Sequence, residues 1–103
     1  MGAVTFTPGT FYECKGRIEF VKKDVEPFNT GLTLKPGDYL RCSKIVFRSG
    51  SKGRGHYAKL HYRWGQSNLV LYHRVSKNRI GSGSWEEMNE MMVLALADVL
   101  ALD

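Results

Sequence analysis

The residues with the clearest chemical potential form a long cationic stretch in the middle of the chain. The protein has 103 residues, with 15 lysines and arginines against 10 acids and a net charge of +5. Between Asp38 and Glu86 no acid occurs, whereas ten basic residues do: Arg41, Lys44, Arg48, Lys52, Arg54, Lys59, Arg63, Arg74, Lys77 and Arg79. A chain that needed charge only for solubility would intersperse the two signs. The stretch therefore predicts a surface for a polyanion.

Aromatic and imidazole side chains are interleaved with these cations. From Tyr57 to Arg63 every second residue carries a phenol ring, an ammonium, an imidazole or a guanidinium, and Tyr72 and Arg74 continue the pattern farther along. Cations displace the counterions of phosphates, and flat rings stack on unpaired bases. We therefore expect a small non-enzymatic protein that binds single-stranded DNA or RNA. The expected contact residues are the ten cations together with Tyr57, His61, Trp64 and Tyr72.

The same cations would also suit a protein partner. The wet face of any sheet carries lysine and arginine, and a small adaptor or inhibitor that binds an acidic protein surface would show the same charge pattern. The run from Ser49 to His56 combines three glycines with Lys52 and Arg54 and has no bulky apolar residue. It predicts a flexible hairpin loop, either a phosphate clamp or a solvated tip, and it does not match a Walker A loop.

A third function class rests on two histidines. His61 and His73 lie on neighbouring predicted strands, where they could act as general base and general acid of a metal-independent ribonuclease. Cys14 and Cys42 each fall inside an apolar alternation, which favours buried, reduced thiols. Because the sequence has no Cys-x-x-Cys and no paired ligand motif, we expect neither a metal nor another cofactor.

The elements that must position these residues are mainly strands. Tyr12 to Phe20 alternates as one half-buried strand, and a connection over residues 24–31 leads to a short extended piece at 32–34. Pro36-Gly37 marks a turn, and a long strand follows from Tyr39 to Arg48. Its alternation slips near Ser43-Lys44, which indicates a β-bulge. Further strands are expected over 57–64 and 69–75, with a turn at 65–68 between them.

Two faces are expected on the strand over residues 57–64. Ala58, Leu60, Tyr62 and Trp64 should share one face, and Tyr57, Lys59, His61 and Arg63 the other.

The end of the chain has a different period. Ser84-Trp85-Glu86-Glu87 matches a capping box, and apolar residues then recur at helical spacing: Trp85, Met88, Met92, Ala95, Leu96 and Val99. This pattern predicts one C-terminal amphipathic helix. Apolar residues beyond a single stripe suggest a homodimer seam through residues 85–102, or an adaptable protein-binding surface.

Together these elements predict an α+β fold, an antiparallel four- to five-stranded meander sheet packed by one C-terminal amphipathic helix, in a single domain over residues 1–103. This order, the charge placement and the tryptophan near the helix start resemble single-stranded nucleic-acid binders of the coactivator PC4 and plant Whirly type. The resemblance implies single-strand binding and a dimer formed through helices. No apolar run approaches the roughly 20 residues of a membrane span, and the start has no signal-peptide pattern. We therefore expect a soluble protein of the cytoplasm, or one associated with nucleoid or nucleus.

Overall fold

The described part of the chain is built almost entirely of β-strands. The computed structural model describes residues 6–27, 30–50, 53–75, 83–89, 91 and 93. The strands are β1 (Phe11–Cys14), β2 (Ile18–Phe20), β3 (Val25–Glu26), β4 (Leu32–Leu34), β5 (Tyr39–Gly50), β6 (Gly53–Trp64), β7 (Ser67–Arg74) and β8 (Trp85–Glu87), with a 3-10 turn η1 (Lys22–Asp24) before β3. The alternation of apolar and polar residues accounts for most of these strands.

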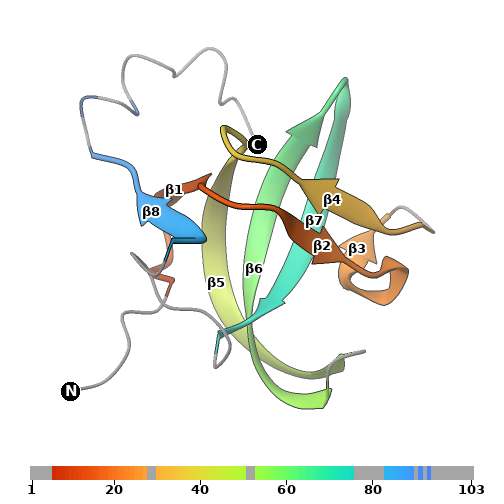
Figure 1. Cartoon of the computed structure of the whole chain (residues 1–103). Helices are drawn as coiled ribbons and strands as arrows, with labels where there is room; N and C mark the ends of the chain where they lie inside the picture. Colours follow the sequence, from red (N-terminus) through yellow and green to blue (C-terminus); the bar gives the residue numbers. More distant parts are fainter. Residues whose placement is uncertain are drawn as a thin grey trace.

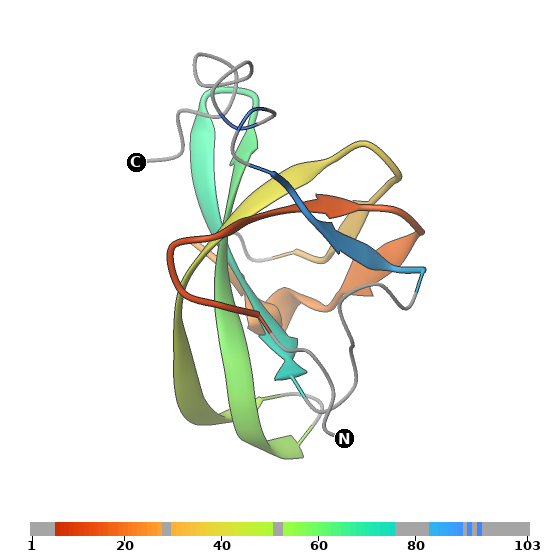
Figure 2. The ribbon, with the colours of Figure 1, turned by 90° about the vertical axis from the view of Figure 1, so that its left-hand side faces the viewer.

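Six strands form one antiparallel sheet in the order β3-β7-β6-β5-β1-β8, while β2 and β4 pair separately. The long strands β5, β6 and β7 lie side by side and bend strongly, and the β2–β4 pair crosses in front of them (Figure 1). The free end of the β5–β6 hairpin extends away from β1, β8, β2 and β4 in both views (Figures 1 and 2). The sheet thus has an inner side toward the β2–β4 pair and an outer side.

The inner side carries the core. Six inward residues of β5, β6 and β7 are fully buried, and Phe20 of β2 and Leu34 of β4 close the core from the opposite side. Phe6, Tyr12 and Trp85 extend the core toward β1 and β8. The fully buried inward residues of the three long strands are Leu40, Cys42, Ala58, Leu60, Leu69 and Leu71. Burial of this apolar surface supplies the main driving force for the fold.

The predicted α+β architecture is wrong. Trp85–Glu87, expected to open a helix, form β8, in which Trp85 pairs with Cys14 and Glu86 with Glu13 of β1. No helix of seven or more residues occurs among the described residues. The helical spacing failed as a guide here because Trp85 is held in the core by pairing with β1, and tertiary packing outweighs local helix signals. The resemblance to PC4-type and Whirly-type proteins depended on that helix. Most of the expected helix and dimer seam, at residue 90, residue 92 and 94–103, lies outside the described residues.

Two smaller expectations also need correction. Residues 12–20 do not form one strand, because the chain leaves the large sheet after Cys14 and starts β2 of the two-stranded sheet at Ile18. The glycine-rich run is not mainly a loop, since β5 continues to Gly50 and β6 begins at Gly53. By contrast, the bulge is confirmed, because the pairing of β5 with β6 shifts register between Cys42 and Lys44.

Candidate nucleic-acid interface

The outer side of β5 and β6 collects five of the predicted contact residues. Arg41 lies opposite His61, and Lys44 lies opposite Lys59, in the pairing of β5 with β6. Residues directly opposite each other in neighbouring strands share a face, and the side chains alternate along each strand. Ala58 and Leu60 are buried inward, so the outer side of β6 carries Lys59, His61 and Arg63, as the alternation predicted. We refer to Arg41, Lys44, Lys59, His61 and Arg63 as the cationic face.

The bulge determines which residues of β5 belong to the cationic face. Ser43 is the extra residue, and its hydroxyl donates to the carbonyl oxygen of Lys59 over 3.4 Å. With that residue inserted, Arg41 and Lys44 both point outward although three positions separate them. Lys44 is exposed and lies opposite Lys59, and like charges in this position destabilise a sheet. In the described part of the chain neither lysine is paired with a carboxylate.

The described acids are engaged away from the cationic face. Glu13 and Glu86 face each other on β1 and β8 with Lys15 between them, at 3.7 and 3.4 Å, and Glu13 is the main cause of the raised pKa of Lys15. Asp38 accepts a hydrogen bond from the Tyr62 hydroxyl at 3.2 Å and one from the Lys35 N–H at 2.9 Å. Glu13 and Glu86 thus lie at the β1–β8 edge of the sheet, and Glu26 lies on β3 at the opposite edge.

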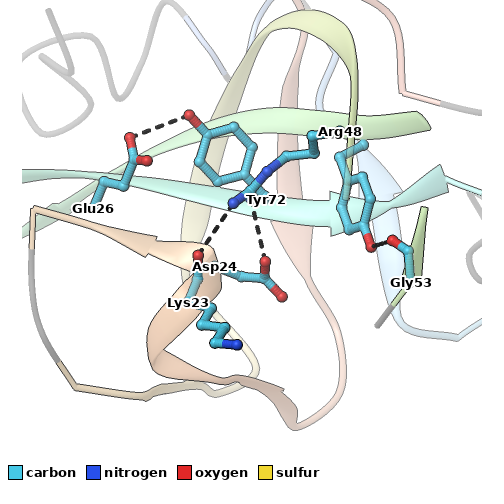
Figure 3. A network of polar contacts seen from close by, with 7 residues as sticks. Lys23, Asp24, Glu26, Arg48, Gly53 and Tyr72 are labelled. Carbon is cyan, nitrogen blue, oxygen red and sulfur yellow. Dashed lines mark hydrogen bonds and ion pairs between the residues drawn. The ribbon is translucent and has the colours of Figure 1, made fainter. Parts of the chain in front are cut away.

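Arg48 is a predicted contact residue that the structure uses internally. Its guanidinium donates to the buried carboxylate of Asp24 at 3.2 Å and to the carbonyl of Lys23 at 3.3 Å (Figure 3). The guanidinium also lies over the ring of Tyr72, 3.9 Å from its centroid, and 5.6 Å from the centroid of the Tyr57 ring. The side chain thus runs from β5 across β6 and β7 to η1 and ties these elements together.

Tyr72 and Tyr57 are likewise part of this network. The Tyr72 hydroxyl donates to Glu26 at 3.2 Å, and burial, followed by the nearby Glu26, raises its pKa. Tyr57 is fully buried and its hydroxyl donates to the carbonyl of Gly53. Since Arg48 covers one ring and the other is buried, neither tyrosine offers the open ring face that base stacking requires.

The side chain of Arg74 explains why residues 53 and 55 are glycines. A Cβ at Gly53 would lie 2.8 Å from the Arg74 guanidinium and one at Gly55 would lie 2.9 Å from it. Their φ angles of 108° and 159° are in or near the region that favours glycine. The glycine-rich run therefore makes room for an arginine of β7. Together Arg48, Tyr57 and Arg74 brace the hairpin end from its outer side.

The inner side of the same hairpin end carries a ring that the sequence pattern did not mark as functional. Phe47 lies opposite His56, beyond the last core residues Ile45 and Ala58, and is 58% exposed. The two rings meet edge to face with centroids 5.3 Å apart, and the Arg54 guanidinium lies 5.9 Å from the Phe47 centroid. The alternation of β5 assigned Phe47 to the face of the core. The signal that could have found it is its position beside the glycine-rich run, where the strand outruns the core.

The histidines do not converge. His61 is on the outer side of β6, whereas His73 of β7 lies opposite Ala58, buried inward against Phe6, Phe20 and Trp85. The Trp85 indole N–H donates to His73 Nε2 at 3.4 Å. The proposed ribonuclease pair is therefore divided between the two sides of the sheet.

Both thiols are buried, and burial raises the pKa of Cys14 and raises that of Cys42 to about 11. Among the described residues, no group of three or more His, Cys, Asp or Glu side chains is arranged to hold a metal ion.

The remaining predicted contacts do not belong to the cationic face as far as the structure describes them. Trp64 is 48% exposed at the opposite end of β6 from the hairpin tip, and Lys52, Lys77 and Arg79 lie outside the described residues. The structure therefore brings together five of the fourteen predicted residues as one face, and it assigns Arg48, Tyr57, Tyr72 and Arg74 to the bracing of the hairpin.

No helix in the described ranges is long and apolar enough to cross a membrane. Comparison of the chain with protein-family models, with curated proteins and with solved structures gave no match.

Proposed function

We propose that the protein binds single-stranded DNA or RNA without catalysis, through phosphate contacts of the cationic face. The observation that carries the proposal is the pair Lys44 and Lys59, directly opposed on neighbouring strands and unpaired with any described carboxylate. Two facing ammonium groups repel each other until an anion lies between them. A phosphodiester chain supplies such anions at regular intervals.

The surroundings of this pair support a polyanion rather than a single small anion. Arg41 extends the positive charge along β5, and Arg63 extends it along β6, on the same side as Lys59 and His61. The acids of β1 and β8 lie on one side of the long strands and Glu26 of β3 lies on the other, so they limit the footprint to the middle of the sheet at β5 and β6. Summed over one surface, such charges attract nucleic acid and speed its association.

A charge-removal experiment tests the proposal. The double variant Lys44→Gln/Lys59→Gln is compared with Lys22→Gln/Lys35→Gln, which removes two exposed lysines elsewhere and has the same net charge. We measure binding of a fluorescent oligothymidylate and an oligouridylate at several salt concentrations. At about 0.7 per phosphate contact, the slope of log affinity against log salt should fall by about 1.4 only in the first variant.

Two results would contradict the proposal. One is equal affinity and equal salt slope in the two double variants. The other is the failure of the unmodified protein to bind either oligomer at low salt, and stoichiometric capture of one acidic protein would then indicate an adaptor.

A further inference from the structure

The free end of the β5–β6 hairpin exposes an aromatic ring that the fold does not need. Phe47 is 58% exposed although its strand neighbour Ile45 packs against the core. Exposing a ring of this size to water is unfavourable, and the described structure shows no compensating packing beyond His56 and Arg54. The ring therefore has the character of a contact residue and not of a core residue.

The hairpin end holds this ring in a fixed position. From its outer side, Arg48 connects β5 to Asp24 (Figure 3). Arg74 lies against Gly53 and Gly55, and the Tyr57 hydroxyl donates to the Gly53 carbonyl. Pairing of the two strands continues to Ser49 opposite Arg54 and Gly50 opposite Gly53. A ring held on a rigid element loses little conformational entropy when it binds a ligand.

The surroundings of Phe47 indicate what the ligand is. A purely apolar partner would find a guanidinium and an imidazole beside the ring, whereas a nucleotide combines a flat base with an adjacent phosphate. We infer that the hairpin end is a base-stacking site, in which an unpaired nucleobase lies on the ring of Phe47 and Arg54 contacts the neighbouring phosphate.

The position of the site fits a strand that also contacts the cationic face. Lys44 and Phe47 are three residues apart on β5, about 10 Å along the strand, and point to opposite sides. Beyond Cys42 no described strand pairs with the edge of β5 that faces away from β6. A single strand can pass over this open edge from Lys44 to Phe47. A duplex keeps its bases stacked within the helix, so the site selects single strands.

This inference rests on the proposed function, and its test separates the two. We compare Phe47→Ala, Phe47→Leu and Phe47→Trp on an oligothymidylate, on an abasic oligomer of equal length and on a duplex. Val21→Ala, which trims another exposed apolar side chain, is the control. Phe47→Ala and Phe47→Leu should weaken binding of oligothymidylate about tenfold and leave binding of the abasic oligomer unchanged. Phe47→Trp should restore the affinity, with indole fluorescence quenched on binding.

Thermal unfolding verifies that the variants remain folded, as expected for an exposed position. The stacking site is overturned if Phe47→Ala binds oligothymidylate like the unmodified protein, or if Phe47→Leu restores binding as fully as Phe47→Trp. In either case a loss of binding in Lys44→Gln/Lys59→Gln would leave the proposed function standing. Binding that is insensitive to the lysines but sensitive to Phe47 would instead contradict the phosphate contacts of the cationic face.

Discussion

Individual cations of the same strand have different roles in this protein. Arg48 and Lys44 both lie on the outer side of β5, yet Arg48 neutralises the buried Asp24 while Lys44 is exposed and faces another lysine. Composition cannot distinguish them, because the partner of Arg48 is 24 positions away in the chain. The distinction has opposite consequences for stability and for binding.

Replacing Arg48 should therefore destabilise the fold. Arg48→Met removes the guanidinium that lies 3.2 Å from the carboxylate of Asp24, which is 1% exposed, and we expect a loss of about 3 kcal/mol in the free energy of unfolding. Lys44→Met, the matched change on the same strand, should alter it by less than about 0.5 kcal/mol. Urea unfolding followed by tryptophan fluorescence measures both. Equal stability of the two variants would show that the Asp24 pair contributes nothing.

The buried thiol of Cys42 and the partly buried hydroxyl of Tyr62 make the fold sensitive to alkali. Burial, reinforced by Asp38, raises the pKa of Tyr62 from 10.0 to about 12, and burial raises that of Cys42 from 9.0 to about 11. Between the unfolded and folded values the unfolded chain binds fewer protons, so stability is full below about pH 9 and falls as the pH rises toward 12.

The Tyr62 contribution can be isolated by substitution. Tyr62→Phe removes the ionisable hydroxyl, and its free energy of unfolding should fall less steeply with pH than that of the unmodified protein, by about 2 kcal/mol over the whole range. Urea midpoints from about pH 8 to about pH 11.5 provide the measurement. Parallel curves for the two proteins would contradict this assignment.

At the scale of elements, the strand β8 is the clearest departure from the sequence pattern. The capping box of Ser84 and Glu87 is a local signal, whereas the pairing of Trp85 with Cys14 is a contact over about 70 positions that no local pattern displays. Strands with strict alternation were predictable, although β6 begins at Gly53 and not at Tyr57, and β7 begins at Ser67 and not at Leu69. The bulge in β5 lies where the slip in the alternation predicted it. The end of β1 before Lys15-Gly16 was not predictable, because the alternation of apolar and polar residues continues across these two residues.

Proline substitution distinguishes a strand from a helix start at β8. The N–H of Met88 donates to Phe11 and the N–H of Lys15 donates to Ser84, so the alternation of the ladder directs the Glu86 N–H toward β1 and the Glu87 N–H away. Glu86→Pro should therefore destabilise the protein by roughly 2 kcal/mol more than Glu87→Pro. Both positions would accept proline in the first turn of a helix. Equal and small effects in thermal unfolding would thus argue against β8.

For the molecule as a whole, the sequence predicted that one surface is positively charged better than it predicted which residues form that surface. Five residues of the acid-free stretch share the outer side of β5 and β6, since alternation fixed Lys59, His61 and Arg63 to one side. It could not show that four of the predicted contacts brace the hairpin, because those contacts depend on η1 and on glycines of a neighbouring strand. Nor could it show that the hairpin extends past the core and leaves Phe47 in solvent.

The bulge at Ser43 affects the shape of β5 but not the side of the sheet on which its other residues lie. A β5 without Ser43 would still alternate in the same phase, with Lys44 outward and Ile45 and Phe47 inward, because the bulge absorbs one whole residue. What such a shortened strand would lose is the local kink and the added twist. Gain or loss of this single residue can therefore change the tilt of the free end of the β5–β6 hairpin, while the same side chains stay on its outer and inner sides.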